Sequence, residues 1–170
     1  KRGTPFSGLL YAGLSLTERG VRVVEFNARF GDPETQCLLA LLDSSPATLL
    51  HAAATGALAS VGLPRWRTGS AVTVVVAADG YPDSPRKGDP ISGVDDANAL
   101  EGVDVIHGGT AVSDGRLVTA GGRVLAVTAV GDDLVQARER VYEGVGLIRI
   151  DGAHHRTDIA EAAAAQGLRG

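Results

Sequence analysis

The chain has 170 residues, of which 44% are hydrophobic and 21% are charged, and its formal net charge at pH 7 is −4, as in a globular protein of one domain or one domain and a fraction. The acidic balance gives no reason to expect binding to nucleic acid. No apolar run approaches the roughly 18 residues of a membrane span, and no signal peptide is visible. We therefore expect a cytoplasmic protein that binds neither nucleic acid nor membrane. Cys37 is the only cysteine, which excludes an internal disulfide and a cysteine metal cluster.

The first elements in chain order are two strands. Residues 7–17 alternate in polarity, residues 18–20 supply a turn and residues 21–30 alternate again, which predicts an antiparallel hairpin. Successive side chains of a strand point to opposite faces. One face of the second strand would carry Val21, Val23, Glu25, Asn27 and Arg29, and the other, which we expect to be a core face, Val24, Phe26, Ala28 and Phe30.

The polar face of the second strand suggests a binding site for a metal and a phosphate. A hard divalent cation such as Mg²⁺ or Mn²⁺ takes oxygen ligands and often bridges them to substrate phosphates, so Glu25 and Asn27 are candidate ligands. Arg29 could meet the phosphate itself, because its guanidinium fits phosphate oxygens in a bidentate way. The alternative is an exposed edge strand on which these side chains simply meet water.

Two helices are expected next. Asp32 and Pro33 are typical of a helix start, and residues 33–42 have helical spacing, with an apolar stripe. Helix N-termini also bind anions, so this start has a possible functional reading too. Pro46 can open a second helix over residues 46–60.

We place a domain boundary in residues 62–70, where turn residues gather, between a first domain of residues 1–62 and a second of residues 70–170. Residues 71–79 are a β-branched run, as in a buried strand. The long loop of residues 80–90 follows, and its Arg86, Lys87 and Gly88 could close on a phosphate or could be a solvated surface charge pair.

The rest of the chain predicts a small antiparallel sheet with a packed helix, so the fold class is α+β. Strands are expected at residues 103–112, 116–120, 122–131 and 147–151, with the third of these in the centre of the sheet. Asp132 and Asp133 would cap a helix over residues 132–145. A terminal helix is expected at residues 160–165. His154 and His155 have no partner at zinc-ligand spacing.

Seven motifs in order make the chain resemble one enzyme family. They are LLYAGLSLT (9–17), EFNARFGDPETQ (25–36), VTVVVAADGYP (72–82), RKGDPI (86–91), IHGGTAV (106–112), GGRVLAVTAVG (121–131) and HHRTDIA (154–160). Together they resemble glycinamide ribonucleotide synthetase, an ATP-grasp ligase of purine biosynthesis. The resemblance covers the C-terminal part of such an enzyme, so it implies the end of an ATP-grasp domain, a β-hairpin with helices, followed by the antiparallel sheet domain.

The resemblance also implies a reaction and roles for residues. ATP phosphorylates the carboxylate of glycine, and the amine of 5-phosphoribosylamine attacks the resulting glycyl phosphate, which releases glycinamide ribonucleotide, ADP and phosphate. Glu25 and Asn27 would hold the metal, Arg29 would stabilise the transferring phosphoryl group, and Asp32 and Glu34 could hold the glycine ammonium.

The resemblance bears on two further positions and on what the chain lacks. Lys87 and Gly88 match a Lys-Gly pair in the family's loop, which supports a substrate-binding role for them.

Many ATP-grasp enzymes carry a second metal-binding acid about a dozen residues before the position of Glu25, where this chain has Gly13. Glu25 would therefore be the only acidic ligand. The N-terminal part of the same enzyme would carry the rest of the ATP site, and this chain alone would be inactive.

Two other functions remain open. The same fold could serve another ATP-grasp carboxylate-amine ligase, although the run Gly31-Asp32-Pro33-Glu34 and the later motifs favour glycine. Residues 71–151 could instead be a non-catalytic carrier or interaction module of the kind that bears biotin. The chain has no methionine to flank a biotinylated lysine, and Lys87 lies in a proline-rich loop, which disfavours that function.

Overall fold

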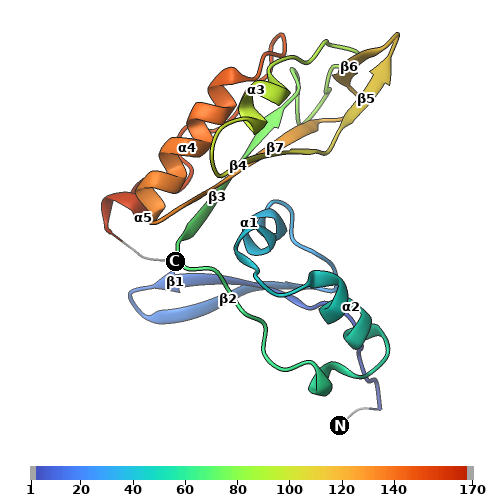
Figure 1. Cartoon of the computed structure of the whole chain (residues 1–170), viewed down its shortest axis with the longest axis vertical. Coiled ribbons are helices and arrows are strands. Elements are labelled where there is room, and N and C mark those ends of the chain that lie inside the picture. Colours follow the sequence, from blue (N-terminus) through green and yellow to red (C-terminus); the bar gives the residue numbers. More distant parts are fainter. Residues whose placement is uncertain (1–2, 168–170) are drawn as a thin grey trace. The chain divides into compact units, whose positions relative to one another are not determined.

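The structure is a computed structural model that describes residues 3–167, and within them the chain divides into two compact units (Figure 1). Unit 1 contains the residues up to Thr35 together with Leu42–Arg67, and unit 2 contains Gln36–Leu41 and the residues from Thr68 onward. The functional domains predicted at residues 1–62 and 70–170 stay a prediction.

Unit 1 is built on a hairpin with helices. Strand β1 (Tyr11–Thr17) pairs antiparallel with β2 (Gly20–Asn27), as the sequence predicts. Helix α1 (Glu34–Leu41) starts in this unit, and α2 (Pro46–Ala54) and a 3₁₀ turn (Leu58–Ser60) follow. Ser45 caps α2 by accepting a hydrogen bond from the Thr48 N–H, with Pro46 in the first turn, where its missing N–H costs nothing.

A β-bulge in the hairpin changes which side chains share a face. The register pairs Gly13 with Glu25 but Leu14 with Val23, so Val24 is an extra residue on β2. Directly opposed residues of an antiparallel pair share a face, so Glu25 lies on the opposite face from Val23. The strict alternation that we expected from Val21 to Arg29 is therefore wrong.

The expected core face of β2 is also wrong for the described residues. Within residues 3–167 the sheet of β1 and β2 contains no further strand, and its apolar side chains are 55–70% exposed. These side chains are Leu14, Val21, Val23, Val24 and Phe26; Phe30 beyond the strand is 45% exposed and Ala28 is exposed as well. We call the exposed residues Leu14, Val21, Val23 and Phe26 the apolar hairpin face.

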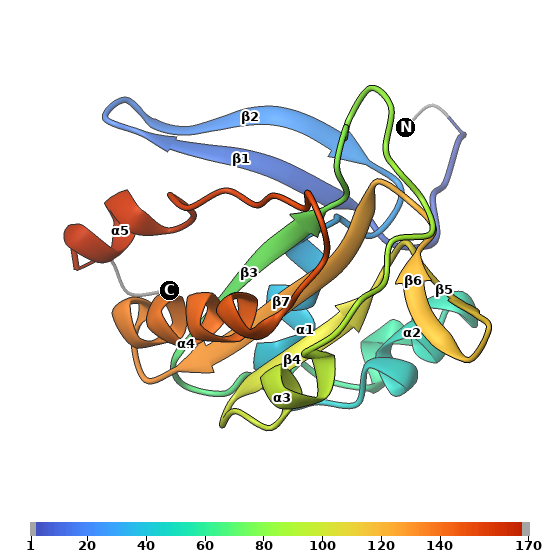
Figure 2. The same cartoon turned by 90° about the horizontal axis from the view of Figure 1, so that it is seen from above.

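Unit 2 is an antiparallel sheet with most of its helices on one side (Figures 1 and 2). The sheet order is β3-β7-β4, so β7 is central, as predicted, and β5 and β6 form a separate ribbon. The bounds are β3 (Ser70–Ala77), α3 (Val94–Asn98), β4 (Val103–His107), β5 (Thr110–Ser113), β6 (Arg116–Thr119), β7 (Arg123–Gly131), α4 (Leu134–Leu147) and α5 (Glu161–Ala165). The predicted α+β class is confirmed.

The core of unit 2 lies between the sheet and the helices α3 and α4, which cover the same face (Figure 2). Gly144 lets α4 approach closely, because a Cβ at this position would lie 2.9 Å from Val103 Cγ1 and 3.1 Å from Val127 Cγ1. On the other face Thr73 Oγ1 and Thr128 Oγ1 share a buried hydrogen bond of 2.8 Å, and Cys37 Sγ of α1 lies 3.1 Å from Thr73 Oγ1. Both faces of this sheet are thus covered within unit 2.

Several predicted boundaries in unit 2 differ from the structure. The strand expected over residues 103–112 is interrupted at Gly108 and Gly109, where the chain leaves the sheet, so β4 and β5 are separate. Residues 147–151 form no strand but only an isolated bridge between Ser92 and Arg149. Helix α3 was not expected. The cap was predicted well: Asp133 Oδ1 accepts a hydrogen bond from the Gln136 N–H at the start of α4.

We expect the substitution Leu125→Ala to destabilise unit 2 by about 3 kcal/mol, because it removes a side chain that is 1% exposed and leaves a cavity that the β-branched neighbours fill poorly. Val112→Ala on β5, where the side chain is 74% exposed, is the matched control and should stay within about 0.5 kcal/mol. Urea unfolding of the 170-residue chain, followed by circular dichroism, measures both. Equal stabilities of the two variants would contradict this account of the core.

Candidate functional site

The candidate site lies on the polar face of the hairpin in unit 1. In the register Tyr11 opposes Asn27 and Gly13 opposes Glu25, so these four residues share one face. The Asn27 amide Nδ2 donates a hydrogen bond of 2.8 Å to Glu25 Oε1. Of the predicted metal pair, Asn27 is half-buried and Glu25 is exposed. The structure therefore brings the two predicted ligands into direct contact.

The donor set of this pair suits a hard divalent cation. The hydrogen bond uses one oxygen of Glu25 and the nitrogen of Asn27, which leaves Glu25 Oε2 and Asn27 Oδ1 as oxygen ligands on neighbouring side chains. Residues 3–167 contain no group of three or more His, Cys, Asp or Glu that could hold a metal ion. A metal here would take most of its coordination sphere from a substrate phosphate and water, as Mg²⁺ commonly does.

Gly13 provides the space for Glu25. A Cβ at Gly13 would lie 3.2 Å from Glu25 Cγ and 3.4 Å from Tyr11 Cε1, which is tight for both side chains. The glycine that departs from the two-acid pattern therefore leaves room for the Glu25 and Tyr11 side chains where they lie in this structure.

A second carboxylate is anchored beside this pair by a residue that the sequence did not single out. The Tyr11 hydroxyl donates a hydrogen bond of 3.1 Å to Glu34 Oε1 at the start of α1. This hydrogen bond raises the pKa of the Tyr11 phenol, and the charges of Glu34 and Glu25 raise it further. Tyr11 lies within an apolar run, and only the register that places it opposite Asn27 shows that it lies beside the predicted metal pair.

Arg29 and Asp32 lie outside regular structure, between β2 and α1. Strand β2 ends at Asn27, so the prediction that Arg29 belongs to the strand face is wrong; its Nη1 donates to the Phe30 carbonyl oxygen at 2.9 Å. Asp32 and Pro33 form a turn directly before helix α1, which begins at Glu34, one residue later than predicted. All five predicted site residues of this segment, Glu25, Asn27, Arg29, Asp32 and Glu34, nevertheless belong to unit 1.

The predicted phosphate loop of unit 2 is built around Arg86. Its guanidinium contacts Asp79 Oδ2 at 3.0 Å, Asp89 Oδ2 at 2.8 Å and Asp151 Oδ2 at 3.0 Å, and also donates to the Asp151 carbonyl oxygen at 2.8 Å. The hydrogen bond to Asp89 is the main reason that the pKa of Arg86 is raised. Arg86 therefore shapes the loop, and its charge is largely compensated.

Lys87 and Gly88 follow this anchor. Lys87 is exposed, while the Gly88 N–H donates to the Thr119 carbonyl oxygen at 2.7 Å with a φ of +89° that favours glycine. The Thr119 side chain also binds this loop, because the Asp89 N–H donates a hydrogen bond to Thr119 Oγ1. Of this pair, the Lys87 side chain is the candidate for contact with an anion, and Gly88 sets the backbone that presents it.

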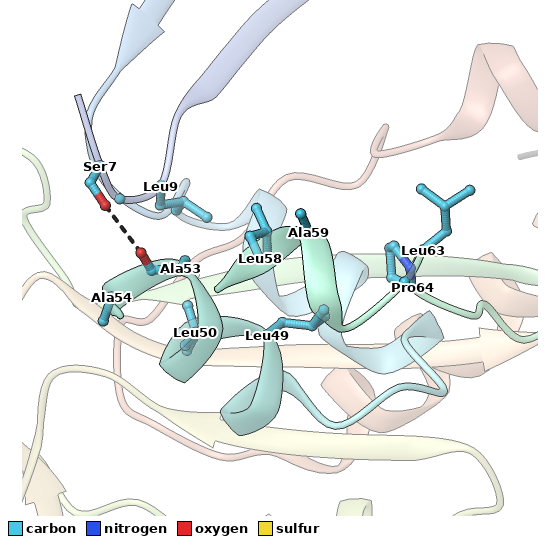
Figure 3. A pocket seen from close by; sticks show the side chains of 12 residues that line it. Ser7, Leu9, Leu49, Leu50, Ala53, Ala54, Leu58, Ala59, Leu63 and Pro64 are labelled. Atoms are coloured by element: carbon cyan, nitrogen blue, oxygen red, sulfur yellow. Dashed lines mark hydrogen bonds between the residues drawn. The ribbon is translucent and has the colours of Figure 1, made fainter. Parts of the chain in front are cut away.

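A hollow of unit 1 lies apart from these residues. It is an apolar groove of about 790 Å³, drawn in Figure 3. Its lining comes from residues 7–9, from α2, from the 3₁₀ turn and from residues 62–64, mostly as Leu and Ala side chains. Ser7 Oγ donates to the Ala53 carbonyl oxygen at 3.1 Å across one end. Such a lining suits packing against another apolar surface better than chemistry on a charged substrate.

Two family models match successive parts of the chain. Residues 71–162 match the phosphoribosylglycinamide synthetase C domain, and residues 1–35 match the ATP-grasp (A) domain of phosphoribosylglycinamide synthetase. Among described residues no helix is long and apolar enough to cross a membrane.

Curated relatives are longer than this chain. A phosphoribosylamine–glycine ligase of Streptomyces coelicolor is 58% identical over 166 residues, which are 96% of this chain and 40% of the relative. The ligase of the same name from Mycobacterium tuberculosis is 54% identical over 165 residues, 96% of this chain and 38% of the relative. The chain thus spans about 40% of the length of these relatives.

Solved structures have the same fold. The crystal structure of a phosphoribosylamine–glycine ligase from Thermotoga maritima matches with a TM-score of 0.73 and 35% identity, over 88% of this chain and 36% of that one. An N5-carboxyaminoimidazole ribonucleotide synthetase from the same organism matches with a TM-score of 0.60 and 20% identity, over 85% of this chain and 37% of that one, and this likeness concerns the fold alone.

The contact between Tyr11 and Glu34 predicts a change in titration. We expect Glu34→Gln to lower the pKa of Tyr11. The Glu34 carboxylate accepts a hydrogen bond from the protonated phenol and repels the phenolate, so its loss removes two effects that raise this pKa. Titration of the 170-residue chain, followed by the ¹³C NMR signal of the Tyr11 side chain, measures the shift. Glu18→Gln in the hairpin turn is the matched control and should leave this pKa unchanged. An unchanged pKa in Glu34→Gln would contradict the observed contact.

Proposed function

Because the chain belongs to the phosphoribosylglycinamide synthetase family, we propose that it is the C-terminal part of a phosphoribosylamine–glycine ligase of purine biosynthesis. The observation that carries the proposal is the pairing of Glu25 with Asn27 on one hairpin face, next to a carboxylate held at Glu34. The complete ligase, meaning this chain with the N-terminal part that its relatives carry, would join glycine to 5-phosphoribosylamine at the expense of ATP. A cytoplasmic location is part of the proposal.

The proposed reaction has two steps. A carboxylate oxygen of glycine attacks the γ-phosphorus of ATP, which forms glycyl phosphate and releases ADP. The amine nitrogen of 5-phosphoribosylamine then attacks the acyl carbon, the nitrogen loses a proton and inorganic phosphate leaves, which gives the amide. Phosphoryl transfer of this kind depends mainly on positioning and on electrostatic stabilisation.

The residues of the hairpin face would supply both. Glu25 and Asn27 would hold Mg²⁺ or a similar ion, whose charge would offset that of the ATP phosphates. Arg29, whose guanidinium lies on the segment just after β2, would stabilise charge on the phosphoryl group in transit. Asp32 and Glu34 would hold the glycine ammonium, with Glu34 oriented by the neighbouring hydroxyl.

The loop of unit 2 would bind a phosphate group of a substrate. Lys87 is exposed at the end of a loop that Arg86 and Thr119 hold in place, which is the arrangement that presents a cation at a fixed position. Gly88 would contribute the backbone turn next to it. We assign these two residues to substrate binding on this basis.

The N-terminal part of the ligase would cover the apolar surfaces of unit 1. The apolar hairpin face and the groove of Figure 3 expose leucine, valine and phenylalanine side chains that the described residues of unit 1 leave uncovered. Burial of apolar surface stabilises association by about 25 cal/mol per Å² before its entropic costs. The chain's span of about 40% of its relatives supports this assignment of the partner.

The metal pair gives the direct test of the proposal. In the complete ligase, Glu25→Gln or Asn27→Ala should lower turnover at least about a hundredfold, the scale of losing one electrostatic contact to a transition state. Ser113→Ala at the exposed end of β5 is the control that should keep its activity. Glycine-dependent ADP release at limiting Mg²⁺ is the measurement. Unchanged turnover in both metal-pair variants would refute the assigned site.

The isolated chain should have no ligase activity and should bind Mg-ATP with a dissociation constant in the millimolar range or weaker. At exposed positions each charge contact is worth only about 1 kcal/mol, whereas association first costs at least about 4 kcal/mol of lost freedom. Isothermal titration calorimetry of the 170-residue chain checks the affinity. Micromolar binding, or glycine-dependent ADP release by this chain alone, would mean that the nucleotide site is more complete than proposed.

A further inference from the structure

Tyr11 connects the hairpin that carries Glu25 and Asn27 to the Glu34 carboxylate at the start of α1. Its ring is half-buried on β1, directly opposite Asn27 in the register, and its hydroxyl reaches Glu34 Oε1 at 3.1 Å. Tyr11 and Glu34 are separated by β2 and the segment after it in sequence, yet both belong to unit 1.

Two residues determine where the Glu34 side chain lies. A Cβ at Gly31 would lie 2.5 Å from Glu34 Oε2 and 3.1 Å from Glu34 Cβ, so the side chain folds back over this glycine, which is buried. Oε2 thus lies over Gly31 while Oε1 accepts the hydrogen bond from Tyr11. Gly31 thus leaves room for the folded-back side chain, and the Tyr11 hydroxyl holds its Oε1.

We propose that Tyr11 is a positioning residue that orients Glu34 to receive the ammonium group of the amino-acid substrate. This inference deepens the proposed function and rests on it. A phenol suits the task because it is a neutral donor: it fixes one oxygen of the carboxylate but leaves its negative charge and its other lone pairs to the ammonium. A lysine or arginine at the same place would neutralise the charge that the substrate needs.

The test is Tyr11→Phe in the complete ligase, since this change removes one oxygen atom and keeps the ring. We expect the KM for glycine to rise about tenfold, as for the loss of a hydrogen bond to a charged group, while kcat and the KM for ATP stay within about twofold. Tyr142→Phe in unit 2 removes a hydroxyl that also makes hydrogen bonds, to the Arg156 carbonyl oxygen and from the Ile159 N–H, and is the matched control with unchanged kinetics. A purely structural role of Tyr11 would affect the constants of all substrates alike.

A second variant separates this inference from the proposed function. If Glu34→Gln leaves the KM for glycine unchanged, the assigned role of Glu34 is wrong and the proposed function needs revision at this point. If Glu34→Gln raises this KM but Tyr11→Phe does not, the inference alone is overturned.

The double variant tests whether Tyr11 acts through Glu34. The combination of Tyr11→Phe with Glu34→Gln should be no worse than Glu34→Gln alone, because residues that act through one another are not additive. Multiplication of the two separate effects would instead mean that the Tyr11 hydroxyl contacts the substrate directly, and it would overturn the positioning role.

Discussion

The extra residue at Val24 is the constraint on which the candidate site depends. A strand without the bulge would place Val21 and Val23 on the face of Glu25 and Asn27, and valine would surround the metal pair. The register shift moves these valines to the other face, where they join Phe26. One inserted residue therefore sorts the hairpin into a polar face that can bind ions and an apolar face that can pack.

The elements of the chain could largely be predicted from the sequence, because their signals are local. The valine run of β3, the alternation of β7 and the Asp cap of α4 each need only neighbouring residues to be interpreted. The bulge could not be predicted, because it depends on how two strands align and not on either strand alone. The same holds for Tyr11, whose role depends on a partner across the sheet and a second at the start of a helix.

The two polar regions of the chain use the same residue types differently. Glu25 and Asn27 on β2 and Arg29 just after it stand at alternate positions of one short segment, and the side chains of Glu25 and Arg29 are exposed. In unit 2 the guanidinium of Arg86 forms ion pairs with Asp79, Asp89 and Asp151. These ion pairs hold the loop in shape and compensate the charge of Arg86. Residue type alone suggested a phosphate contact for Arg86, and only the folded geometry assigns it to the loop.

The strand order β3-β7-β4 has a consequence for synthesis of the protein on the ribosome. Strand β3 carries no charged residue and finds its sheet partner β7 only about 45 residues further along the chain, which at typical rates of translation means a delay of a few seconds. During that time its valines emerge unpaired, in a segment of high β-propensity of the kind that readily associates with other nascent chains. We expect this interval to be the period in which the protein most depends on chaperones.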